Sequence, residues 1–315
     1  MRRVGGITEA MWLLRLEMAA ISSLYIAANV ATGLGIDARI YHAAAQALLA
    51  GGNPWAQGVD GVIFAAPPPT LILYLPFAWL PQGAFVAVAI GICAVSAVLA
   101  IRQLRLPYWW LLFPPIIESV AVANPDIVVL ALLVTRGGSL LAILLKIYAV
   151  IPVVILGRWR PAITAVAVMA VTAPFLRWDL YVGQAAEISA AIWEQAGVHG
   201  KSAYAIPSLV PIAVVGLLVL GPRRAAWLAV PALWPATQLH YAALALPALT
   251  PAMAAIMSLP VPGAAVAAIV VAVMMDPARP RSARDVLRQW DPRGGRAAGE
   301  AAGAETQATR GSAGT

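Results

Sequence analysis

Charged side chains are scarce in this chain: they make up 11% of its 315 residues, whereas apolar residues make up 61%. Soluble domains carry about a quarter charged residues and about half apolar ones. This composition therefore excludes an ordinary water-soluble globular domain. Cysteine is nearly absent as well, because Cys93 is the only one, and it lies within an apolar run. The chain can therefore form neither an internal disulfide nor a cysteine metal site, and we expect Cys93 to be inert packing.

Nucleic-acid binding is also not indicated, although the formal net charge is +7. The basic residues do not form stretches interleaved with aromatic side chains, as a nucleic-acid surface would require. Arginines instead separate the apolar runs. That distribution is typical of cytoplasmic loops in a membrane protein.

Apolar runs recur from residue 11 to residue 275, each long enough to enter or cross a hydrocarbon core of about 30 Å. Backbone amides in lipid must be paired within their own segment, so these runs should be helical. We predict an all-α, multi-pass transmembrane bundle of about 9–11 spans, some of them short and broken, over residues 1–275. Residues 276–315 lack apolar periodicity and are predicted to be a disordered polar tail.

Arginine positions also predict which segments share a side of the membrane. If the arginines mark the cytoplasm, most of the unusual polar residues fall in turns on the opposite side. The first of these turns follows the first apolar run, where Asp37 and Tyr41 lie four residues apart. On a helix they would share a face, and the helix would end near Gly51. Asp37 could cap this helix, act chemically, or do both.

Several short motifs resemble glycosyltransferase family 87, a family of polytopic GT-C enzymes that includes polyprenol-phosphate-mannose-dependent mannosyltransferases. The similarity covers most of residues 11–258. It rests on motifs that occur in the family's order: Asp37-x-x-x-Tyr41, Gly51-Gly-Asn-Pro-Trp55, Phe64-Ala-Ala-Pro-Pro-Pro with Pro76 to Pro81, Asn124-Pro-Asp126, Leu145-Lys-Ile-Tyr148 and Gln238-Leu-His-Tyr241. One departure is Ala66, which stands where the family usually has an aromatic residue before its prolines.

The resemblance implies that Asp37 is the catalytic base that deprotonates the acceptor hydroxyl. A phosphate leaving group is stable without protonation, so a base and a cationic phosphate pocket would suffice. The cations available on the outer side are Lys146, His240, Arg39 and Arg177. A lysine inside an apolar run is costly unless it is paired or hydrated, although it could instead extend to the membrane interface.

Other polar and aromatic residues of the motifs are candidate substrate-binding groups: Tyr41, Asn53, Asn124, Asp126, Tyr148 and Tyr241. Asn124 and Asp126 could contact sugar hydroxyls or cap the helix that follows them. The tyrosines could stack on a sugar or an isoprenoid, but aromatic residues are also common at both membrane interfaces.

The sequence thus predicts transfer of a sugar from a polyprenyl-phosphate donor, and the resemblance implies that this sugar is mannose. The acceptor would be a lipid or glycan hydroxyl at the outer face of a bacterial cytoplasmic membrane. No cofactor is required by the sequence, and a divalent metal is compatible with it. A transporter or lipid flippase would also use broken helices and buried charges. An inactive scaffold of the same fold is the third alternative.

Overall fold

The computed structural model describes residues 3–56, 58–235, 237–277, 280 and 282–291. Almost all of the described secondary structure is helical, and the exception is one small hairpin. In the hairpin, β1 (Gly58–Val59) pairs antiparallel with β2 (Val62–Ile63). The predicted all-α class is confirmed at this level.

The first half of the chain contains the following helices, in which η marks a 3-10 helix: α1 (Arg3–Thr32), α2 (Ile36–Leu49), α3 (Pro68–Tyr74), η1 (Leu75–Phe77), α4 (Gln82–Gln103), η2 (Tyr108–Leu112), α5 (Pro114–Ala121), α6 (Asp126–Val134), η3 (Arg136–Gly138), α7 (Ser139–Leu145), η4 (Ile147–Ala149) and α8 (Val150–Ile155). The second half contains α9 (Trp159–Thr172), α10 (Trp178–Gly183), α11 (Ala185–His199), η5 (Ala203–Ala205), η6 (Pro207–Leu209), α12 (Val210–Leu220), α13 (Pro222–Leu233), η7 (Leu239–Ala248), α14 (Pro251–Ser258), α15 (Ala264–Met275) and α16 (Ala283–Gln289).

Two of the described helices are long and apolar enough to cross a membrane: Glu9–Thr32 within α1, and α4. The pair α5 and α6 would make a third span, bent by 118° at the break between them. Shorter apolar helices account for much of the remaining chain, among them α9 and α15. Prolines explain part of this fragmentation, because Pro114 and Pro115 begin α5 and Pro125 directly precedes α6.

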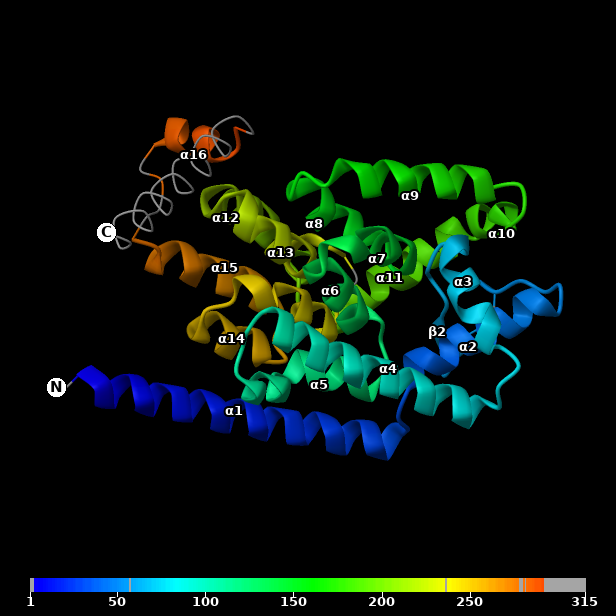
Figure 1. The fold of residues 1–315 in the computed structure, drawn as a ribbon, viewed down its shortest axis with the longest axis horizontal. Helices are drawn as coiled ribbons and strands as arrows, with labels where there is room; N and C mark the ends of the chain where they lie inside the picture. Colours follow the sequence, from blue (N-terminus) through cyan, green and yellow to red (C-terminus); the bar gives the residue numbers. More distant parts are fainter. Residues whose placement is uncertain (1–2, 57, 236, 278–279, 281, 292–315) are drawn as a thin grey trace, which may run out of the picture.

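The long helices run along the longest axis of the molecule (Figure 1). The start of α1 and helix α16 lie at one end, on the left in the view. The opposite end is formed by α2, α3, β2 and α10. One large apolar core joins the long and short helices, and a smaller cluster, built around Trp55, Phe64 and Leu71, holds the second end together.

The segment 276–315, predicted to be a disordered tail, contains a helix among its described residues. Ser282 caps α16 in a capping box with Asp285. After the helix, the indole of Trp290 donates a 2.9 Å hydrogen bond to the carbonyl of Leu218. The expectation of disorder is therefore wrong for residues 282–290, where local capping and one aromatic contact suffice to order the chain. Residues 292–315 lie outside the described residues.

Candidate functional site

A cavity of about 140 Å³ lies between α2, the segment 62–67, η4, α11 and η7. One part of its wall is polar and consists of Asp37, Tyr41, Asn124, Lys146, Tyr148, Gln238, His240 and Tyr241. The rest is largely apolar and consists of Ile40, Val62, Ile63, Phe64, Ala65, Ala66, Pro67, Ile147, Ala191, Ile192 and Trp234. The cavity thus combines a charged surface with an apolar one.

Most of the residues predicted from the sequence meet at this cavity. They are Asp37, Tyr41, Asn124, Lys146, Tyr148, His240 and Tyr241, and they come from segments far apart in the chain. Gln238 and Trp234 also line the cavity but were not predicted as site residues.

Four predicted residues do not line the cavity: Arg39, Asn53, Asp126 and Arg177. Arg39 forms an ion pair of 3.4 Å with Asp60, and Arg177 pairs with Asp179 at the same distance. The side-chain oxygen of Asn53 accepts a hydrogen bond from the backbone N–H of Trp55, which makes it part of a local turn.

The position of Asp37 is set by a junction between α2 and α5. The backbone N–H of Gly35 donates to the carbonyl of Ala121 at 2.8 Å, and that of Asp37 donates to the carbonyl of Val122 at 3.0 Å. Amides at the start of α2 thus satisfy carbonyls at the end of α5, where neither group has a partner within its own helix. Gly35 has a φ of 73°, which a glycine adopts without strain.

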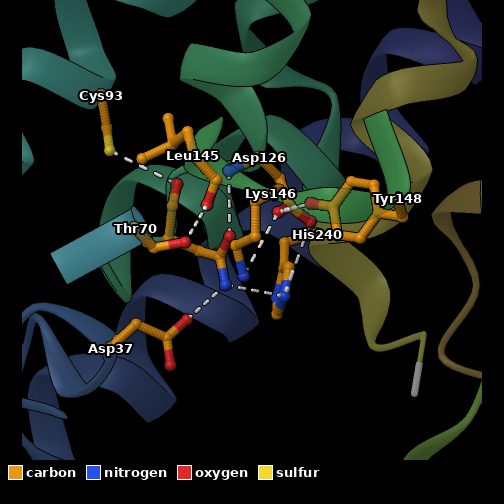
Figure 2. A network of polar contacts seen from close by, with 9 residues as sticks. Asp37, Thr70, Cys93, Asp126, Leu145, Lys146, Tyr148 and His240 are labelled. Carbon is orange, nitrogen blue, oxygen red and sulfur yellow. Dashed lines mark hydrogen bonds and ion pairs between the residues drawn. The ribbon is translucent and has the colours of Figure 1, made fainter. Parts of the chain in front are cut away.

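Asp37 lies in the first turn of α2, and Gly35 occupies the N-cap position. No side-chain hydrogen bond caps this helix, so the capping role considered for Asp37 is not observed. The positive end of the helix dipole still favours a carboxylate at this position. Oδ2 of Asp37 accepts a hydrogen bond from Asn124, while Oδ1 has no recorded donor among the described residues (Figure 2).

The side chain of Asn124 links two parts of the cavity wall. Its Oδ1 atom accepts from the backbone N–H of Asp126 at 2.9 Å, which identifies the other end of the amide as the NH₂ group. That group donates to Asp37 at 2.6 Å and lies 3.0 Å from Nε2 of His240. Ala123, with a φ of 56°, ends the preceding turn and directs Asn124 toward these partners.

These contacts determine the protonation state and tautomer of His240. Because Asn124 presents an N–H to Nε2, this ring nitrogen must be the acceptor and the proton must be on Nδ1. A doubly protonated ring would place one donor against another. Nδ1 is enclosed and has no hydrogen-bond partner among the described residues. The expectation that His240 supplies a positive charge is therefore not supported by its geometry: the ring is a neutral group.

Lys146 is the cation of the cavity wall. Its ammonium lies 5.6 Å from the ring centre of Tyr41 and 5.9 Å from those of Tyr148 and Tyr241. These distances are in the range of cation–π attraction. Lys146 follows the last turn of α7 in an extended conformation, and the hydroxyl of Thr70 donates to the carbonyl of Leu144 in that turn at 3.0 Å.

Asp126 lies behind the cavity wall and is fully buried. Its carboxylate is 3.8 Å from the ammonium of Lys146 and accepts a hydrogen bond from the hydroxyl of Tyr148 (Figure 2). The second oxygen, Oδ2, is 3.8 Å from Nε2 of His240. Asp126 was predicted to bind substrate, but in this position it is a partner of Lys146 and Tyr148.

Tyr41 in the cavity wall and Glu118 near it are also ionisable. Burial and the nearby Asp37 carboxylate raise the pKa of the Tyr41 phenol well above its ordinary value, so its hydroxyl remains a hydrogen-bond donor. Glu118, which the sequence predictions do not include, lies near the backbone N–H of His240, and the positive charge of Lys201 acts on its carboxylate. An acid inside the apolar run of α5 was the signal that could have identified it.

No metal centre can be assigned within the described residues, because no three His, Cys, Asp or Glu side chains gather closely enough to hold an ion. Comparisons with protein-family models, with curated proteins and with solved structures each found no match to this chain.

Proposed function

We propose that this protein is an integral membrane glycosyltransferase that uses a polyprenyl-phosphate sugar, with mannose as the first candidate. The observation that carries the proposal is the convergence of Asp37 and Lys146 on one cavity. A carboxylate suits deprotonation of a hydroxyl, and a cation suits a phosphate. The apolar part of the wall suits the first isoprene units of the donor.

The proposed reaction is a single displacement with inversion at the sugar. The acceptor oxygen attacks the anomeric carbon while the bond from that carbon to the phosphate oxygen breaks. The acceptor proton goes to Oδ1 of Asp37, which accepts no hydrogen bond from the described residues, and the bonding electrons leave with the polyprenyl phosphate. Lys146 and the neighbouring tyrosine hydroxyls would stabilise the charge that develops on the phosphate.

The residues named in this proposal have different tasks. Asn124 holds Oδ2 of Asp37, so it is a positioning residue, and neutral His240 holds Asn124 in turn. Asp126 balances the charge of Lys146 from behind the wall. Gln238 and Tyr241 are left to contact sugar hydroxyls or the phosphate, because both line the cavity. No cofactor enters this scheme.

The proposal includes a multi-pass, GT-C-like bundle in a bacterial cytoplasmic membrane. In support of it, α1 and α4 are candidate spans, and several shorter apolar helices pack beside them. Arg3 is the first residue of α1. Helix α4 runs in the opposite direction to α1, with Arg102 in its last turn and Arg105 just after it (Figure 1). The start of α1 and the last turn of α4 lie away from α2, which carries Asp37 and Tyr41 of the cavity wall (Figure 1). The cavity would therefore face outward if these arginines are cytoplasmic.

One observation favours a second function. Helices α5 and α6 form a bent pair around Asn124 and Asp126, and transporters use such breaks to bind ions or substrates. A lipid flippase would move the polyprenyl phosphate without cleaving it. An inactive scaffold would retain the cavity without either activity.

The test compares Asp37→Asn with Asp60→Asn, an exposed aspartate of the same outer region that lies outside the cavity. Both variants are reconstituted in lipid nanodiscs with radiolabelled polyprenyl-phosphate mannose and a mixture of lipid and glycan acceptors. Loss of a general base should slow transfer by about 10²–10⁴-fold in Asp37→Asn while donor binding is retained. Asp60→Asn should react like the wild type.

Transfer by Asp37→Asn at the wild-type rate would refute the role of this residue. A flippase would be recognised in liposomes by movement of intact donor across the bilayer, and a scaffold by neither transfer nor movement in the wild type.

A further inference from the structure

Arg15 lies in α1, which does not line the cavity, and aromatic rings surround its guanidinium. Its guanidinium carbon is 5.4 Å from the ring centre of Trp12 and 5.1 Å from that of Trp109. The two indoles thus contact one cation, one from the same helix and one from η2. Arg15 makes no ion pair and no hydrogen bond with any other described residue, and its Nε atom is enclosed without a partner.

Some other arginines of the described chain, unlike Arg15, have polar partners. Arg39 and Arg224 pair with aspartates, and Arg158 donates to the carbonyl of Leu133. Arg15 differs in that aromatic faces hold the guanidinium while its terminal nitrogens remain available. A guanidinium within a membrane span is costly unless an acceptor is supplied. An acceptor for these nitrogens could therefore be supplied from outside the described residues.

The depth of Arg15 in the membrane follows from two helices. It is six residues beyond Glu9, where the first candidate span begins, or about 9 Å along the helix. Trp109 follows the end of the second candidate span at Gln103 by six residues. Arg15 and Trp109 are in contact, so both helices place this group near the same membrane interface. An arginine side chain can reach the headgroup level from there.

The surrounding residues also fit an interface. Trp109 and Trp110 stack with their ring centres 4.9 Å apart, and Tyr108 is 60% exposed. Tryptophan and tyrosine concentrate at the headgroup level of bilayers. Arg102 and Arg105 lie at the same end of α4, which identifies this as the arginine-rich side of the molecule.

We propose that Arg15, Trp12 and Trp109 form a binding site for the phosphate of an anionic phospholipid in the arginine-rich leaflet. Two guanidinium nitrogens donate to phosphate oxygens in a bidentate arrangement, which is the geometry that arginine favours. The indoles fix the plane of the guanidinium and line the path of the glycerol and acyl chains. This site is separate from the cavity and does not depend on the proposed glycosyl transfer.

The experiment measures lipid retention by native mass spectrometry on the full-length protein, exchanged into detergent containing phosphatidylglycerol or phosphatidylcholine. The variants are Arg15→Gln, Arg15→Lys and Arg102→Gln, the last being an exposed arginine of the same end without this aromatic contact. Wild type and Arg102→Gln should retain one tightly bound phosphatidylglycerol. Arg15→Gln should bind it at least about tenfold more weakly, and Arg15→Lys should be intermediate, because it keeps the charge without the bidentate geometry.

Trp12→Leu provides a second variant in case Arg15→Gln does not fold, because Trp12 is 57% exposed and contributes little to the core. It should also weaken phosphatidylglycerol retention. Equal retention in Trp12→Leu, Arg15→Gln and wild type would overturn the proposal, as would equal retention of phosphatidylcholine. Competition by millimolar inorganic phosphate would identify a soluble anion as the ligand and would refute a lipid site.

Discussion

The amide of Asn124 donates a hydrogen bond of 2.6 Å to Oδ2 of Asp37, across 87 residues of sequence. It joins the first polar turn of the chain to the break between α5 and α6. Backbone hydrogen bonds from α2 to the end of α5 support the same contact. The orientation of the proposed base is therefore set by a distant segment, and this makes the contribution of Asn124 measurable.

Asn124→Ala should lower the turnover number of glycosyl transfer by about 10–100-fold, because the carboxylate of Asp37 loses the group that orients it. The KM for the donor should change little, since the donor phosphate is bound elsewhere. Steady-state kinetics in nanodiscs separate the two parameters. Asn53→Ala is the matched control, because the side chain of Asn53 accepts a hydrogen bond within its own turn and lies outside the cavity. A larger loss in Asn53→Ala than in Asn124→Ala would contradict this account.

The affinity for the donor should not change with pH in the way that a titrating His240 would cause. Asn124 presents an N–H to Nε2, so the neutral ring is the form that fits the site. Between about pH 5.5 and 7.5, the range in which an ordinary histidine titrates, the dissociation constant of the donor should not follow a histidine titration. Binding to nanodisc-embedded protein measures this directly. An increase in affinity as the ring becomes protonated would show that His240 acts as a cation after all.

Lys146→Met should weaken donor binding by about ten- to a hundredfold, which corresponds to a charged hydrogen bond of roughly 1.5–3 kcal/mol. Arg39→Met and Arg177→Met should bind the donor normally, because both arginines lie outside the cavity and pair with nearby aspartates. Equilibrium binding of a polyprenyl phosphate distinguishes these outcomes. If Arg177→Met lost affinity and Lys146→Met did not, the phosphate site would have to be moved to α10.

Removing Lys146 alone leaves the buried carboxylate of Asp126 without its counter-charge, and this can destabilise the protein. The double variant Lys146→Met with Asp126→Asn removes both charges. It should unfold at a higher temperature than Lys146→Met and bind the donor as weakly. Recovery of donor affinity in the double variant would contradict a direct role for Lys146.

Gly35→Ala should destabilise the protein by about 2–5 kcal/mol, from a strained positive φ and from overpacking. A Cβ atom on Gly35 would lie 2.4 Å from Cγ1 of Val86. Gly51 has a similar φ of 75° but open space around it, so Gly51→Ala should lose only about 1–2 kcal/mol. Thermal unfolding monitored by tryptophan fluorescence compares the two. Equal decreases in the unfolding temperature of the two variants would show that contact with Val86 does not affect stability.

The sequence was sufficient to predict the helical class and much of the cavity. The long apolar runs favoured helices, because a helix pairs the backbone within its own segment in lipid. Asp37 and Tyr41 meet the same cavity because they are four residues apart on α2. Lys146 was recognisable because a charged side chain within an apolar run costs free energy unless it is paired or hydrated.

The errors have equally local causes. Arg39 is two residues from Asp37, and such residues do not share a helix face, so it turns toward Asp60. The burial of Asp126 depends on how α6 packs against Tyr148 and Lys146, which the sequence spacing does not specify. The state of His240 depends on the orientation of one amide, that of Asn124, and this appears only in three dimensions.

The junction between α2 and α5 is made by main-chain groups of Gly35, Asp37, Ala121 and Val122. Every residue type except proline supplies the same main-chain donor and acceptor. Most substitutions should therefore leave these hydrogen bonds intact, apart from those at Gly35. The segment between α2 and α3 includes the hairpin and part of the apolar cavity wall, and it takes no part in this junction. An engineer could therefore exchange residues 50–66 to recruit a different acceptor and keep the carboxylate of Asp37 in register.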